Sequence, residues 1–178
     1  MIHTSQMPPQ IAGRPDDFQT PPIALEPLYP YLKQDWVIWE CACGAGNLSG
    51  ALSSRGYTVA ATDLYTMPIQ NDFLVVPLQP EIDCIVTNPP FSLKDKFLAR
   101  CYFLGKPFAL LMPVTALGGQ RRQSLYRKYG LQIIMLGRRV NFETPSGNGT
   151  GAWQEHAWIA NGLNLPRDIM FAELQKEL

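Results

Sequence analysis

Short apolar runs alternate with longer segments of mixed polarity along this chain. Six of these runs have the length and the apolar content of buried strands. They lie at 36–39, 59–62, 82–86, 107–112, 132–136 and 155–160, and we expect the last of them to be the last strand of the chain. Because helical patterns separate several of the runs, the sequence predicts a parallel α/β sheet.

Helix signals follow two of the predicted strands closely. After Gly46, apolar residues recur at spacing i, i+3 and i+4 until Gly56 stops the pattern. A second helix is expected after Ser92, with Ser92 as its N-cap and Asp95 completing a capping box. This second helix carries one apolar stripe and should end at Gly105.

Two further segments are expected to be helical. The loop 114–120 contains a glycine pair and leads into a basic helix that should end near Tyr129. Near the N-terminus, Thr20 can cap a short helix that has Pro21 and Pro22 in its first turn.

Length and composition indicate one globular domain. The chain has 178 residues, of which 46% are hydrophobic, so it can bury one sizeable core but not two ordinary ones. Residues 1–17 are polar and contain prolines, and we expect a loose arm there, followed by a single domain over 18–178. No apolar run reaches the length of a membrane span, and the first residues lack the pattern of a signal peptide. We expect a cytoplasmic protein without membrane contact, either a monomer or a homodimer.

The cysteines fit a reducing compartment. The chain has four of them and two histidines, and no two cysteines have the spacing of a zinc-binding pair. We therefore expect no metal, and we interpret the cysteines as reduced, buried thiols.

Net charge bears on the partner. The formal net charge is zero, whereas proteins that bind nucleic acid are usually basic. Basic residues nevertheless recur just after predicted strand ends, where they could contact phosphates, and each cluster could equally be a solvated helix face. The candidates are Arg121, Arg122, Arg138 and Arg139.

The most specific chemistry lies between the strand 82–86 and the helix that follows it. Asn88, Pro89, Pro90 and Phe91 form a tight loop at the C-terminal end of that strand, where open α/β sheets bind ligands. The prolines fix the backbone, which holds the Asn88 side-chain oxygen and the Pro89 carbonyl as rigid acceptors. Phe91 adds a flat apolar face. These groups suit a planar ring with an exocyclic amino group, although an ordinary capped turn could share the pattern.

A second motif follows the first strand. Glu40 ends this strand, and a loop of small residues that includes Gly44 and Gly46 leads into the first helix. The next strand ends at Asp63. A glycine loop lets a ligand approach the backbone, and an acid at the next strand end can accept hydrogen bonds from ribose hydroxyls.

Together these motifs resemble the class I S-adenosylmethionine-dependent methyltransferases. The order Glu40-x-x-x-Gly44-x-Gly46, Asp63 and Asn-Pro-Pro-Phe is similar to that of the amino-methyltransferases, chiefly DNA adenine-N6 enzymes, and the length resembles compact phage and prophage members. The segment 18–22 resembles their extra N-terminal motif. The resemblance implies a Rossmann-like fold with a mostly parallel seven-stranded sheet, helices on both faces and an antiparallel final strand. It also implies S-adenosyl-L-methionine as the cofactor.

The resemblance also implies roles for particular residues. The cofactor would contact Thr20, Pro21, Glu40, Ala42, Gly44, Gly46, Asp63, Leu64, Asp72, Phe73 and Asn88. Residues Gln19 to Pro21 would lie at its methionine end, and a proline-rich segment that only wraps a domain edge is an equal alternative. Asp72 would accept from the adenine amino group, and Phe73 would pack on the adenine ring. Phe142 matches the position of an aromatic residue that is set against the target base, and a core phenylalanine is an equal alternative. It begins a glycine- and proline-rich segment, 141–151, that we expect to be mobile.

The expected reaction transfers a methyl group to N6 of adenine in DNA, either flipped from a duplex or in a single strand. About 50 residues separate Phe91 from Phe142, and all are needed for the sheet, so no separate target-recognition domain is expected. Three alternatives share the motifs: an RNA adenine-N6 methyltransferase, a protein glutamine methyltransferase and a non-catalytic cofactor-binding partner subunit.

Overall fold

A computed structural model describes residues 18–65, 70–143 and 154–174 of the chain. The predicted loose arm, 1–17, lies outside these residues. So does the segment 144–151, which is most of the loop that was expected to be mobile.

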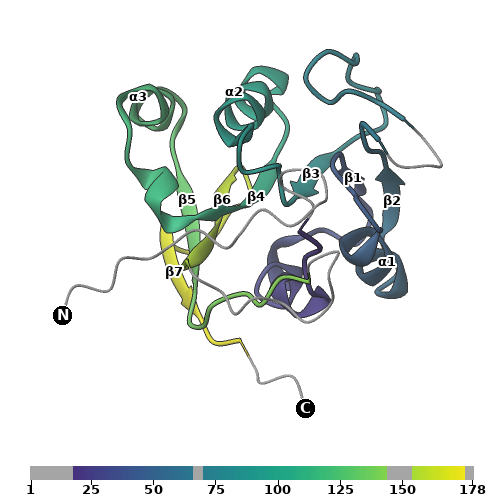
Figure 1. Cartoon of the computed structure of the whole chain (residues 1–178), viewed down its shortest axis with the longest axis horizontal. Helices are drawn as coiled ribbons and strands as arrows, with labels where there is room; N and C mark the ends of the chain where they lie inside the picture. The colour runs from purple at the N-terminus through teal and green to yellow at the C-terminus, as the bar shows by residue number, and fades with distance from the viewer. Residues whose placement is uncertain (1–17, 66–69, 144–153, 175–178) are drawn as a thin grey trace.

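One seven-stranded sheet crosses the molecule, in the order β2-β1-β3-β4-β6-β5-β7 (Figure 1). Its strands are β1 (Val37–Glu40), β2 (Thr58–Ala61), β3 (Cys84–Thr87), β4 (Phe108–Pro113), β5 (Gln132–Leu136), β6 (His156–Asn161) and β7 (Ile169–Ala172). Strand β6 runs antiparallel to both of its neighbours, β4 and β5, while every other pairing is parallel. The expected mostly parallel sheet of seven strands is confirmed.

Helices cover both faces of this sheet (Figure 1). Helices α2 (Lys94–Leu104) and α3 (Gln120–Tyr129) lie over one face, and α1 (Asn47–Ser54) lies on the other with the short 3₁₀ helices η1 (Pro22–Leu25) and η2 (Tyr29–Tyr31). A third 3₁₀ helix, η3 (Val114–Leu117), occupies most of the predicted loop 114–120.

The strands divide their side chains between two cores, as the pleat of a sheet requires. In β3, Cys84 and Val86 pack into the core under α1 and the N-terminal segment, whereas Ile85 packs into the core under α2 and α3. Trp158 of β6 extends the first core and donates from Nε1 to the Ala24 carbonyl at 2.7 Å. Because both faces are covered, the central strands are apolar over most of their length, which is why they could be predicted from the sequence.

Two predicted helix starts are wrong in detail. The Leu93 amide donates to the Pro90 carbonyl at 2.9 Å, so a turn forms first and α2 begins at Lys94 with Leu93 as its N-cap. Ser92 is therefore not the cap, and the expected capping box does not form. Asp95 instead pairs with Arg122.

The N-terminal helix also differs from the prediction. Its N-cap is Pro21 rather than Thr20, and no side chain caps it. Thr20 itself is buried. The prolines remove backbone donors and confine the segment to two short 3₁₀ helices.

The strand at 155–160 is not the last. β7 follows it and extends the sheet beyond β5 at the opposite edge from β2. Ile169 and Phe171 of β7 are exposed, while Met170 and Ala172 are half-buried. Four residues with so weak an apolar contrast give too little periodicity to be recognised as a strand.

Candidate active site

A cleft opens at the C-terminal ends of β1, β2 and β3, the edge where the sequence placed its candidate residues. Its volume is about 740 Å³. Ten of the predicted site residues line it: Thr20, Glu40, Ala42, Gly44, Asp63, Leu64, Asp72, Phe73, Asn88 and Pro90. Pro21, Gly46, Pro89, Phe91 and Phe142 lie outside the lining of the cleft.

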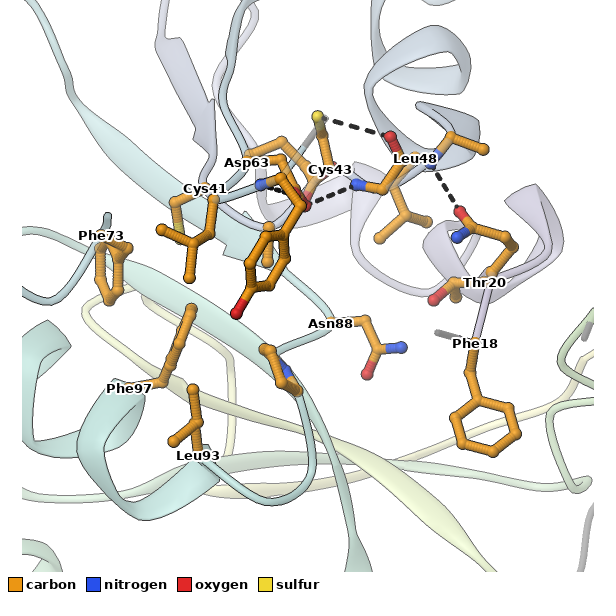
Figure 2. Close-up of a pocket in the computed structure, with 18 of the residues that line it drawn as sticks. Phe18, Thr20, Cys41, Cys43, Leu48, Asp63, Phe73, Asn88, Leu93 and Phe97 are labelled. Carbon is orange, nitrogen blue, oxygen red and sulfur yellow. Dashed lines mark hydrogen bonds between the residues drawn. The ribbon is translucent and has the colours of Figure 1, made fainter. Parts of the chain in front are cut away.

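Asp63 ties the glycine loop to the segment that follows β2 (Figure 2). Its Oδ2 accepts from the Gly44 amide at 3.0 Å, and its Oδ1 accepts from the Tyr65 amide at 2.8 Å. Gly44 and Gly46 have φ of 52° and 89°, in the left-handed region that favours glycine. The carboxylate therefore already holds the glycine loop.

Gln19 reaches the same loop from the N-terminal segment. Its Oε1 accepts from the Ala45 amide at 2.8 Å, and its side chain lies 2.8 Å from the point where a Cβ on Gly44 would stand. Its backbone pairs with Glu143 through bonds of 2.9 and 3.0 Å. The segment that was expected at the methionine end of the cofactor thus contacts the glycine loop directly.

Glu40 is a buried acid at the end of β1. The Thr87 hydroxyl, at the end of β3, donates to its Oε1 at 2.6 Å. Burial raises the pKa of Glu40 to about 8, and the hydrogen bonds from Thr87 and the Ala42 backbone oppose this rise only partly. At neutral pH the carboxyl is therefore mostly protonated.

Asn88 carries an unpaired acceptor at the cleft. Its side chain extends from the end of β3 toward Phe18 (Figure 2), and its Oδ1 is buried without a hydrogen-bond partner among the residues that the structure describes. Leaving a buried polar atom unpaired typically costs about 1–3 kcal/mol. Such an atom calls for an explanation, and an incoming donor is one.

The residues expected around the cofactor's adenine are largely used within the chain. Asp72 Oδ1 accepts from the Leu74 amide at 2.9 Å and so caps its own turn. Phe73 is only 2% exposed, because it packs between Trp39 and Phe97 with centroid distances of 5.1 and 4.8 Å. The Phe73 ring contributes an edge of the cleft rather than an open face.

An aromatic cluster includes Phe91, the last residue of the loop 88–91. Phe91 stacks on His156 with a centroid distance of 5.5 Å, and Phe142 meets Phe91 edge-on at 5.9 Å. Phe142 is 8% exposed and belongs to the core, so both interpretations of this residue keep support.

His156 is a residue of this cluster that no sequence motif predicts. Its Nδ1 lies 3.1 Å from the Gln154 carbonyl, while its Nε2 is buried without a partner in the described part of the chain. Burial lowers the pKa of His156 to about 4, so the ring is neutral at physiological pH. No motif surrounds this histidine, and only the fold brings it against Phe91.

The four candidate arginines fall into two pairs. Arg122 donates to Asp95 at 2.6 Å and to two backbone carbonyls, and Arg139 pairs with Glu155 at 2.8 Å. Arg121 and Arg138 are exposed, and we find no ion pair for either of them within 18–65, 70–143 and 154–174. All four follow strands β4 and β5, whose ends lie at the same edge of the sheet as the cleft.

All four cysteines are buried, as expected, and none is joined to another in the structure. Over the described ranges, no cluster of three or more His, Cys, Asp or Glu side chains could hold a metal ion. None of the helices described is long and apolar enough to span a membrane.

No protein-family model matches this chain, and no curated protein sequence matches it. Solved structures do. A chain described as the modification subunit of a type I restriction enzyme from Vibrio vulnificus has a TM-score of 0.53 at 14% identity, over 84% of this chain and 45% of that one. A SAM-dependent methyltransferase from Archaeoglobus fulgidus has a TM-score of 0.50 at 12% identity, over 78% of this chain and 91% of that one.

This chain spans less than half of the Vibrio subunit. At such low identity the likeness concerns the fold alone. The seven-stranded sheet, the helices on both faces and these neighbours together show that the chain has the Rossmann-like fold of class I methyltransferases.

Proposed function

We propose that this protein is an S-adenosylmethionine-dependent methyltransferase that methylates N6 of adenine in DNA. The observation that carries the proposal is the buried Oδ1 of Asn88, which has no hydrogen-bond partner in the described ranges and stands at a cleft of about 740 Å³. A chain that tolerates such an atom gains if a ligand donates to it, and an exocyclic amino group is a suitable donor.

The glycine loop and Asp63 form the proposed cofactor half of the cleft. Gly44 brings backbone close to the cleft, and the Asp63 carboxylate lines it as an acceptor of the kind that binds ribose hydroxyls. The Archaeoglobus neighbour is itself a SAM-dependent methyltransferase, which supports this cofactor.

Asn88 forms the proposed reacting half, and the carbonyl of the next residue, Pro89, is the second acceptor that we propose, although Pro89 does not line the cleft of the free protein. The amino nitrogen attacks the methyl carbon, the bond from carbon to sulfur breaks with its electron pair on sulfur, and the nitrogen then loses a proton to water. The amino nitrogen is a weak nucleophile because its lone pair is conjugated into the ring. Acceptors on its hydrogens support the positive charge that grows on it and aim its lone pair at the methyl group.

Two observations favour DNA as the substrate. The Vibrio neighbour is described as a modification subunit of a restriction enzyme. Arg121 and Arg138 are exposed at the cleft edge of the sheet, where they can neutralise phosphates. A base within a duplex must first be flipped out to reach the cleft.

Methyl transfer from tritium-labelled S-adenosylmethionine tests the proposal. Matched DNA, RNA and protein pools are offered to the wild type and to Asn88→Ala, and labelled nucleosides are identified. We expect N6-methyladenine in DNA from the wild type alone. Cofactor affinity should be nearly unchanged in Asn88→Ala, since Asn88 serves mainly the transition state. Label in RNA or protein instead would move the substrate assignment, and full turnover by Asn88→Ala would refute the mechanism.

A further inference from the structure

Three phenylalanines from distant segments meet in one cluster at the end of the cleft that Phe18 lines. The rings of Phe18 and Phe91 are nearly parallel, with centroids 6.2 Å apart and an interplanar angle of 22°. Phe142 stands edge-on to both, at 6.3 Å and 62° from Phe18 and at 5.9 Å and 81° from Phe91. Two parallel plates with a perpendicular ring beside them have the outline of a slot.

A third ring fits between the two plates only if they separate. A planar ring held between two others makes a contact of about 3.5 Å on each face, so the facing plates must be about 7 Å apart. The centroids of Phe18 and Phe91 are 6.2 Å apart, which is less than this, so one of the two rings has to move when a third ring enters. Edge-to-face contact with Phe142 would also suit a flat ring in that position.

One plate is fixed and the other can move. Phe91 is backed by His156, whose ring lies 5.5 Å away at 27°, and His156 is the first residue of the central strand β6. Phe18 is half-buried and lies outside any helix or strand, at the wall of the cleft. Opening the slot therefore requires a movement of Phe18 rather than of the sheet.

We propose that Phe18 and Phe91 are the two jaws of a slot that holds one planar, amino-bearing heteroaromatic ring, with Phe142 closing its end. This inference rests on the proposed function: Phe18 would cover the face of the target adenine that points away from Phe91. In the part of the chain that the structure describes, the rings that meet here are the three phenylalanines and the neutral His156, and such a surface suits a neutral ring. Asn88 and Phe18 both line the cleft (Figure 2), so a ring held against Phe18 would lie within the cleft that also holds the Asn88 amide.

The test uses adenosine as the ring and the full chain saturated with S-adenosylhomocysteine, so that the cofactor site cannot take the probe. Saturation-transfer NMR gives the dissociation constant for the wild type, Phe18→Tyr, Phe18→Leu and Phe18→Ala. Phe103→Leu is the matched control, because Phe103 is an aromatic residue of α2 that is 77% exposed. Thermal unfolding and the S-adenosylhomocysteine affinity of each variant show whether the cleft is intact.

We expect Phe18→Tyr and Phe103→Leu to bind adenosine like the wild type, and Phe18→Leu and Phe18→Ala to bind it roughly tenfold more weakly, the lower range of a lost aromatic stack. Inosine, which lacks the amino group, should bind more weakly than adenosine to the wild type. Wild-type affinity in Phe18→Leu would show that Phe18 is only apolar filling and overturn the slot. Tighter binding by Phe18→Ala would make Phe18 a plug and also overturn it, as would a wild type that does not bind adenosine.

These outcomes are distinct from a failure of the proposed function. If the wild type binds adenosine with the expected order of variants but transfers no methyl group to DNA, the slot stands and the reaction is wrong. If DNA is methylated and the Phe18 variants bind adenosine and turn over like the wild type, the reaction stands and the slot is wrong.

Discussion

The Thr87 hydroxyl donates to Glu40 Oε1 at 2.6 Å, joining the ends of two neighbouring strands under the floor of the cleft. Burial raises the pKa of Glu40 to about 8, so the free protein holds this carboxyl mostly protonated at pH 7. Glu40 lines the cleft in which we propose a positively charged sulfonium cofactor. A positive charge nearby favours the ionised carboxyl and lowers its pKa.

We therefore predict that S-adenosylmethionine binding releases a proton from Glu40. Calorimetry at pH 7 in two buffers of different ionisation enthalpy measures the release, which should be a sizeable fraction of one proton per site. Glu40→Gln should bind the cofactor without this release. A wild type whose apparent binding enthalpy is independent of the buffer would refute the prediction.

Asp63 should contribute to cofactor affinity in two ways, by accepting from ribose and by holding the Gly44 amide. We predict that Asp63→Ala weakens binding by about 1.5–3 kcal/mol, the usual worth of a hydrogen bond to a charged group, and that Asp63→Asn weakens it less. The two contributions separate with a cofactor analogue that lacks the ribose hydroxyls. It should lose affinity for the wild type but little for Asp63→Ala. Equal losses for both proteins would remove Asp63 from the ribose site.

His156 predicts a pH dependence of stability. Its pKa falls from an ordinary value of 6.5 to about 4 on folding, so the unfolded chain binds more protons between these values. The contribution of His156 to the free energy of unfolding is therefore complete above pH 6.5 and is lost as the pH falls to 4. At 1.36 kcal/mol per pKa unit, the loss is about 3 kcal/mol.

Glu40 changes stability in the opposite direction, because its pKa is raised from 4.5 to about 8 and its contribution grows as the pH falls. The difference in stability between the wild type and His156→Phe isolates the effect of His156, since Glu40 is present in both proteins. Urea unfolding should show that the variant becomes more stable than the wild type as the pH falls from 6.5 to 4. A difference that does not change with pH would mean that His156 is accessible to protons in the folded state.

The arginine pairs predict separable effects on nucleic-acid binding. Arg121 and Arg138 are exposed, so replacing both with alanine should weaken binding to random-sequence DNA. The plot of log K against log salt concentration should also become less steep, by up to ~0.9 for each phosphate contact that is lost. Arg122→Ala is the matched control. Since its guanidinium holds Asp95 and two carbonyls, its loss should lower stability and leave the salt slope nearly unchanged.

The central strands could be predicted because they are buried on both faces, which makes their apolar runs continuous. β5 was predicted with its observed ends, and β1, β3, β4 and β6 within two residues. β7 escaped prediction because it is a four-residue edge strand whose exposed side chains include Phe171. The start of α2 at Lys94 depends on a turn in which the Leu93 amide donates to the Pro90 carbonyl. This hydrogen bond joins two backbone groups, so the pattern of side chains does not predict it.

The candidate site divides in the same way. Asn88, Asp63 and Gly44 lie in short loops at strand ends, so their positions follow from the strands. The roles of Phe18 and His156 depend on contacts between segments far apart in sequence. Arg122 shows the reverse problem, since its sequence environment is that of a phosphate contact and only the fold supplies Asp95 as its partner.

The placement of β6 between β4 and β5 has a consequence for how the chain is made. β5 is synthesised before β6, but it is connected to β4 in the sheet only by β6, which lies between them. During synthesis, β4 and β5 therefore each keep an unpaired, apolar edge until residues 156–161 have emerged from the ribosome. Unpaired apolar edges favour association with other chains. A premature stop just before His156 would therefore do more than remove an edge strand. It would separate β5 from the rest of the sheet and release an aggregation-prone fragment.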